Sequence, residues 1–148
     1  MKKILIIGSI HNHGIDLLKE NQNFEFEVVD NTDAEFLKNK IIGFDAVSVR
    51  TSKISKEIIN SAKDLKIISR HGVGYDNIDL SAIKDNNITL AITATANAQA
   101  VAEHVLFMLF NIAKRNNMYN DSVKSGKFED RTKLPKTIEL WNKNILIA

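Results

Sequence analysis

The chain of 148 residues contains no cysteine and a single proline, Pro135. Without cysteine there is no disulfide framework, no thiol nucleophile and no thiolate metal site. The longest uninterrupted apolar run, residues 105–110, is far shorter than the roughly 20 residues that a membrane helix needs. The apolar residues that follow Met1 and two lysines are too few for the core of a signal peptide. These absences predict a cytoplasmic protein.

A strong excess of charge of either sign is also missing. The chain has 20 basic and 18 acidic residues, a net charge of +2, and this balance favours neither nucleic acid nor a membrane surface as a partner. Hydrophobic residues make up 44% and charged residues 26%, which is typical of a soluble globular protein. The length suits one ordinary domain with a hydrophobic core.

Apolar runs and helical patterns alternate along the first ninety residues. Strands are predicted at 4–7, 24–29, 44–49, 65–69 and 88–91, with helices at 15–20, 33–38, 55–62 and 80–85 between them. Short loops between such elements suit right-handed crossovers. The pattern therefore predicts an α/β fold, a flavodoxin-like parallel sheet of five strands with helices on both faces.

A glycine loop follows the predicted strand 65–69, within S-R-H-G-V-G-Y-D-N-I-D-L at 69–80. Gly72 and Gly74 flank Val73, and glycine allows a ligand to approach the main chain closely. Amide N–H groups in such a loop can bind an anion, so we expect a carboxylate site here. Taken alone, the same residues are also consistent with a tight strand-to-helix turn that binds nothing.

Two other loops at the ends of predicted strands carry candidate ligand residues. Arg50 directly follows strand 44–49, where its planar fork suits a carboxylate or a phosphate, although a solvated charge is the simpler interpretation. His11 and His13 follow strand 4–7, but no further ligand lies near them in sequence, so we predict no metal site. Their loop also lacks both phosphate-binding glycine motifs.

The residues 97–115 predict a long helix that is apolar on nearly every side, which must be covered from several directions. Within it, Glu103 and His104 are adjacent and point roughly 100° apart, so packing is expected rather than an acid–base pair. Residues 116–136 are polar and mildly basic and predict a solvated connection. A last strand is expected at 144–148.

Four segments together resemble the D-isomer-specific 2-hydroxyacid dehydrogenases, the family of D-3-phosphoglycerate dehydrogenase and hydroxypyruvate/glyoxylate reductase. They are V-S-V-R-T at 47–51, L-K-I-I-S-R-H-G-V-G-Y-D-N-I-D-L at 65–80, N-A-Q-A-V-A-E-H at 97–104 and S-G-K-F at 125–128. The linker T-A-T-A at 93–96 departs from the family, in which a proline or glycine is usual.

The resemblance implies an oxidoreductase that moves a hydride between NAD or NADP and C2 of a small D-2-hydroxy or 2-oxo acid. It implies that the amides of Val73 and Gly74 hold the substrate carboxylate and that Arg50 holds a carboxylate or a remote phosphate. Val73 and Val101 would lie beside the nicotinamide. Helix 97–115 would run between two domains and into a homodimer contact.

The resemblance also implies an incomplete enzyme. The catalytic arginine, glutamate and histidine of the family and its pyrophosphate-binding loop have no counterparts in 1–148, so no catalytic residue is assigned and the cofactor is not expected to bind this chain alone. We expect a substrate-binding domain at 1–96. An interdomain helix, a connection and the first strand of a truncated dinucleotide-binding domain would occupy 97–148.

An alternative is a non-enzymatic module of flavodoxin-like fold that binds a small acid or takes part in an interaction. Receiver domains share this architecture, but they need an aspartate at the end of the third strand. Here that place holds Val49, Arg50 and Thr51, which argues against a receiver.

Overall fold

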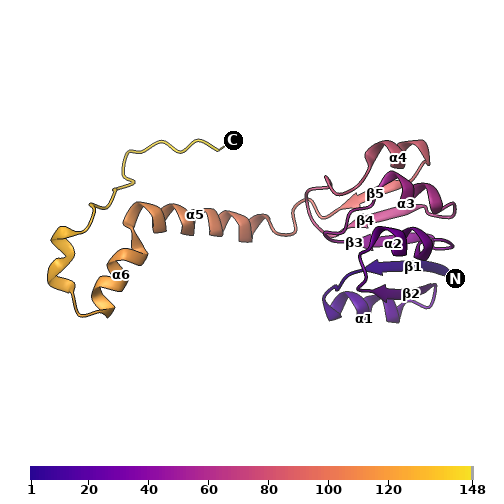
Figure 1. The fold of residues 1–148 in the computed structure, drawn as a ribbon, viewed down its shortest axis with the longest axis horizontal. Helices are drawn as coiled ribbons and strands as arrows, with labels where there is room; N and C mark the ends of the chain where they lie inside the picture. Colours follow the sequence, from indigo (N-terminus) through magenta and orange to yellow (C-terminus); the bar gives the residue numbers. More distant parts are fainter. Residues whose placement is uncertain (148) are drawn as a thin grey trace. The chain divides into compact units, whose positions relative to one another are not determined.

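In a computed structural model, which describes residues 1–147, the apolar runs of the first ninety residues form one parallel sheet (Figure 1). The strand order is β2-β1-β3-β4-β5, and every neighbouring pair runs parallel. The five-stranded sheet predicted from the sequence is thus confirmed. The strands are β1 (Lys2–Ile7), β2 (Phe24–Val29), β3 (Ala46–Val49), β4 (Ile67–Arg70) and β5 (Thr89–Ile92).

Four helices connect these strands. The chain passes from β1 to the edge strand β2 and then in the opposite direction through β3, β4 and β5. Right-handed crossovers therefore place α1 on one face and α2, α3 and α4 on the other. Contacts between α2 and α3 and between α3 and α4 agree with this arrangement. The helices are α1 (Asn12–Glu20), α2 (Ala34–Lys40), α3 (Lys56–Ser61) and α4 (Leu80–Asp85).

The hydrophobic core lies between the sheet and helices α2, α3 and α4. Leu5, Val47 and Ile68 are paired across β1, β3 and β4, so they share a face and are almost fully buried. Leu37 of α2 and Ile59 of α3 pack into the same cluster with no exposed surface. Burying each such side chain contributes about 1.5–3 kcal/mol, so this face holds the carboxyl ends of the strands in place.

Truncation of a central core residue tests this account. We expect Ile68→Ala to lower the free energy of unfolding by about 2–5 kcal/mol, because a fully buried side chain leaves a cavity. Ile42→Ala is the matched control, since Ile42 is 58% exposed and its truncation should cost less than about 0.5 kcal/mol. Urea denaturation of the two variants measures the difference, and equal losses would contradict the assigned core.

Helix α4 begins at a side-chain cap. The carboxylate of Asp79 accepts hydrogen bonds from Ser81 Oγ at 2.7 Å and from the N–H of Ala82 at 2.8 Å. These two bonds, the one from Ser81 first, hold the pKa of Asp79 below its usual value. The capped helix follows the glycine loop directly and so helps to fix where that loop ends.

The cap makes a pH-dependent contribution to stability. A carboxylate whose pKa is lowered in the folded state stabilises the fold above its unfolded pKa of about 4, and this stabilisation is lost as the pH falls through the folded pKa. Asparagine also caps helices but does not titrate. We expect wild type to gain stability over Asp79→Asn between about pH 3 and pH 6. Urea denaturation across this range measures the gain, and a pH-independent difference would contradict it.

Residues Asn97–Ala148 form a second compact unit, separate from Met1–Ala96. The predicted helix is present as α5 (Ala98–Lys114) and ends at Arg115, whose left-handed φ of 51° turns the chain. Among the described residues, no helix is long and apolar enough to cross a membrane.

The segment predicted as a solvated connection is exposed but largely helical. It contains α6 (Asn116–Lys124) and the 3-10 helix η1 (Phe128–Lys133). Ser122 Oγ donates to the carbonyl of Lys127 at 2.8 Å, and Arg115 Nε donates to the carbonyl of Lys136 at 3.0 Å. Polar composition alone did not predict these elements, because bonds between distant residues help to hold them.

The strand predicted at 144–148 is not formed at residues 144–147, and Ala148 lies outside the described residues. A strand needs a neighbour for its N–H and C=O groups, and these residues have no β pairing. The side chains of Leu146 and Ile147 are 91% and 88% exposed.

Candidate functional site

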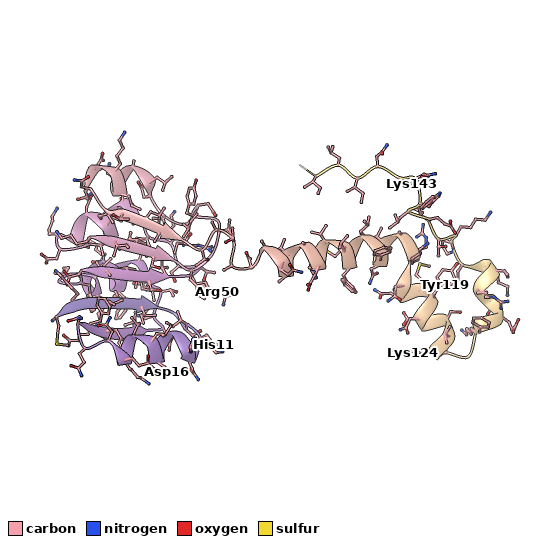
Figure 2. All side chains as sticks on the ribbon, turned by 180° about the vertical axis from the view of Figure 1, so that it is seen from behind. His11, Asp16, Arg50, Tyr119, Lys124 and Lys143 are labelled. Atoms are coloured by element: carbon pink, nitrogen blue, oxygen red, sulfur yellow. The ribbon has the colours of Figure 1, made fainter. Side chains whose placement is uncertain are left out.

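The parallel sheet brings three loops to the same edge of the first unit. Because all strands point the same way, Gly8 after β1, Arg50 after β3 and His71 after β4 lie at one edge. Figure 2 shows Arg50 and His11 together at this edge of the sheet. Loops at the carboxyl ends of parallel strands are the usual ligand-binding region of open α/β sheets.

The glycine loop presents main-chain donors at this edge. The N–H of Gly72 donates to the carbonyl of Arg70 at 3.0 Å, and the N–H of Thr93 donates to the carbonyl of Gly72 at 3.1 Å. The amides of Val73 and Gly74 donate to no acceptor within residues 1–147. Both residues are exposed, so these two N–H groups are available to an anion.

The backbone conformation explains why residue 72 is a glycine, and the side chain of Arg70 lies against it. The φ of Gly72 is +150°, and a Cβ added there would lie 1.2 Å from Nη1 of Arg70. That Nη1 donates to the carbonyl of His71 at 3.0 Å, while Nε is buried without a partner in the described part of the chain. The guanidinium therefore lies against the α-carbon of Gly72, beneath the loop. Sequence reasoning missed Arg70, although its place two residues before Gly72 was a signal.

Arg50 is the second predicted anion-binding group and is exposed. Its guanidinium forms no salt bridge or hydrogen bond with residues 1–147. Val49, just before it, pairs with Arg70 in the β3–β4 ladder, so Arg50 and the glycine loop start from adjacent strand ends. The structure thus places Arg50, Val73 and Gly74 at one edge of the sheet.

A hollow lies beside this site and not in it. It has a volume of about 570 Å³ and is lined by residues 53–57 and 76–80, in the turns that precede α3 and α4 and the first residues of those helices. None of Arg50, Val73 and Gly74 lines it. Its charges are of both signs, with Lys53 and Lys56 facing three carboxylates, so we place anion binding at the free amides instead.

His11 and His13 serve the start of α1. The N–H of His13 donates to Nδ1 of His11 at 3.2 Å, so His11 caps the helix. Within residues 1–147 no group of three or more histidine or acidic side chains is placed to hold a metal ion.

The remaining candidates lie on α5 in the second unit. Val101, predicted beside the nicotinamide, is 51% exposed there. Glu103 accepts from Gln99 Nε2 at 3.0 Å, while the ring of His104 lies 5.9 Å from that of Phe107. Glu103 and His104 are therefore not paired with each other, as the sequence predicted.

Residues 4–141 match the catalytic domain of the D-isomer specific 2-hydroxyacid dehydrogenases. The chain belongs to this family. The D-3-phosphoglycerate dehydrogenase of Archaeoglobus fulgidus is 34% identical over 128 residues, which cover 86% of this chain and 24% of that protein. The enzyme of the same name from Methanocaldococcus jannaschii is 34% identical over 146 residues, covering 98% of this chain and 27% of that protein.

Solved structures agree with the family assignment. A Pyrococcus horikoshii protein matches with a TM-score of 0.80 and 26% identity, over 97% of this chain and 44% of that one. The 3-phosphoglycerate dehydrogenase of Entamoeba histolytica, solved with NAD⁺, matches with a TM-score of 0.67 and 29% identity, over 76% of this chain and 39% of that one. The chain thus spans less than half the length of each of these relatives.

Proposed function

We propose that this chain is the substrate-binding part of an NAD- or NADP-dependent oxidoreductase that acts on D-2-hydroxy acids and 2-oxo acids. One observation carries the proposal. The amides of Val73 and Gly74 are free donors at the same sheet edge as the unpaired Arg50, in a family of dehydrogenases of such acids. The composition supports a cytoplasmic location for it.

The proposed division of roles follows from charge. The two amides donate hydrogen bonds to the substrate carboxylate, and Arg50 binds a second anionic group such as a carboxylate or a phosphate. The apolar side chains of Val73 and Val101 suit the face of a nicotinamide, and the bound cofactor supplies or accepts the hydride. The 148 residues contain no G-x-G-x-x-G motif, so this chain is proposed to hold the acid and not the cofactor.

The same amides also support the second candidate, a non-enzymatic module that senses a small acid. The two candidate functions differ in whether a nicotinamide cofactor acts together with the acid site. A dehydrogenase part works with a nicotinamide cofactor, whereas a sensor needs only the acid. NADH that changes the affinity for the acid, with chemical-shift changes at Val73 or at Val101, would favour the enzyme.

Glyoxylate binding to the 148-residue chain tests the proposed acid site. In a titration followed by ¹⁵N NMR, we expect the largest shifts at the amides of Val73 and Gly74. Gly72→Ala should weaken binding by about tenfold or more, because a φ of +150° suits only glycine and the added Cβ would also displace the Arg70 guanidinium.

Gly43→Ala is the matched control for this test. Gly43 also has a positive φ, of 81°, but an added Cβ would meet no atom within 4 Å. It lies in the turn before β3, at the opposite edge of the sheet, so the variant should bind glyoxylate as wild type does. Shifts spread over the surface, or equal binding by both alanine variants, would refute the acid site. Hydroxypyruvate turnover with NADH by this chain would refute its proposed incompleteness.

We also propose that α5 takes part in a homodimer or other self-association. Within its own unit, α5 buries only Ala113, while Leu106, Phe107 and Phe110 are each more than half exposed. An apolar helix surface of this kind is unfavourable in water, and a second copy of the chain is the proposed cover.

Sedimentation velocity tests this association. We expect the wild-type chain to sediment as a dimer or larger species at about 100 μM, since buried aromatic side chains dominate such interfaces. Phe107→Lys with Phe110→Lys should shift it to the monomer. Met118→Lys on α6, where Met118 is 42% exposed, is the control and should leave the association unchanged. A wild-type monomer at this concentration would rule the proposal out.

A further inference from the structure

Asn77 joins the loop that carries Arg50 to the glycine loop. Its side-chain Nδ2 donates to the carbonyl of Ser52 at 2.8 Å, and its own carbonyl accepts from the N–H of Ile54 at 2.8 Å. Ile54 in turn forms an isolated parallel bridge with Ile78, and both side chains are buried. One residue thus connects two loops that are 25 positions apart in the sequence.

In the described part of the chain, residues 51–53 are attached to the rest of the unit by one hydrogen bond, from the Asn77 side chain. The N–H groups of Thr51, Ser52 and Lys53 donate to no acceptor within residues 1–147. Among the hydrogen bonds of the described chain, the only one that reaches the main chain of these three residues is the bond from Asn77 to the Ser52 carbonyl. The amide group of Asn77 therefore holds the middle of the loop after Arg50, while main-chain bonds hold its end at Ile54.

On its other side, Asn77 is firmly linked to the free amides. The N–H of Ile78 donates to the carbonyl of Tyr75 at 3.0 Å, which closes the turn that follows Gly74. Asn77 is three residues from Gly74, and its partner Ser52 is two residues from Arg50. The path from the amides to the arginine through this hydrogen bond is therefore short.

Stability of the fold is an incomplete explanation for an asparagine here. The Oδ1 atom of Asn77 is buried and has no partner within residues 1–147. A buried oxygen without a hydrogen bond is unfavourable. The free energy lost at Oδ1 therefore opposes the stabilisation that comes from the bond of Nδ2. What its side chain adds is the donor that holds the Ser52 carbonyl.

We propose that Asn77 is a positioning residue, which sets the spacing between Arg50 and the amides of Val73 and Gly74. It thereby favours acids that carry a second anionic group over acids with a carboxylate alone. This inference rests on the proposed acid site and adds to it the residue on which the preference depends. Asn77 acts through Arg50 and needs no contact with the substrate.

Two acids that differ by a single group test the inference. D-Glycerate carries a carboxylate alone, and D-3-phosphoglycerate adds a phosphate at the far end. We expect wild type to bind the phosphorylated acid at least about tenfold more tightly, because Arg50 forms charge-assisted bonds with the phosphate. Arg50→Gln should remove most of this preference. The dissociation constants are measured by ¹⁵N NMR at one ionic strength and at pH 7.

Asn77→Ala is the decisive variant. It should lower the preference for the phosphorylated acid by about fivefold or more and leave D-glycerate binding within about twofold of wild type. In Arg50→Gln with Asn77→Ala, the second change should add nothing, because both act on the same contact. Asn77→Asp, which has the same shape without the donor, provides the same measurement if the alanine variant does not fold.

Asn86→Ala is the matched control. Asn86 Nδ2 also joins two elements, donating to Asn60 Oδ1 of α3 and to the carbonyl of Ala82, both at 2.9 Å. It lies just after α4 (Leu80–Asp85), at the end of that helix away from the glycine loop. We expect this variant to keep the preference of wild type.

The possible outcomes separate the inference from the function on which it rests. Wild type that binds neither acid would overturn both. A preference that Arg50→Gln removes and Asn77→Ala keeps would overturn the inference alone. Equal weakening of both acids by Asn77→Ala would assign Asn77 a merely structural role and would also overturn it.

Discussion

The parallel pairing of β3 with β4 is the constraint on which the site depends. The register that places Val49 opposite Arg70 makes both strands end together, and the N–H of His71 donates to the carbonyl of Val49 at 2.8 Å. A cation and a loop of free amides therefore begin side by side at one edge. Burial of Val47 and Ile68 holds this register, since a shift of either strand by one residue would turn its side chain out of the core.

The proposed acid site combines two kinds of donor with different physical properties. Main-chain amides at Val73 and Gly74 are held by the backbone and lose little freedom when an anion binds. Arg50 has a long exposed side chain that must be ordered, and its charge is screened by salt. The carboxylate common to all 2-hydroxy acids thus suits the rigid amides, while the variable end of the acid suits the arginine.

The sequence predicted the sheet well because a buried strand appears as a continuous run of apolar residues. The apolar runs gave all five strands, and β2 and α4 have the predicted bounds, Phe24–Val29 and Leu80–Asp85. It failed where the cause is not local. The bond from Asn77 to Ser52 spans 25 positions, and the contact between Arg70 and Gly72 depends on the conformation of the Arg70 side chain. No periodicity predicts either of these, and the helices in 116–133 depend partly on similar distant bonds.

The second unit leaves most of its large apolar side chains exposed, whereas the first unit buries many of its own. The first unit covers its apolar residues with its own helices, so its fold needs little beyond residues 1–96. Among the described residues of the second unit, Ala113 is the only buried apolar side chain, and a helical hairpin of this size cannot offset the entropy of folding without further cover. The proposed self-association would supply this cover from a second copy of the chain. The order of α5 would then depend on association, whereas the proposed acid-binding edge of the sheet depends only on the core of its own unit.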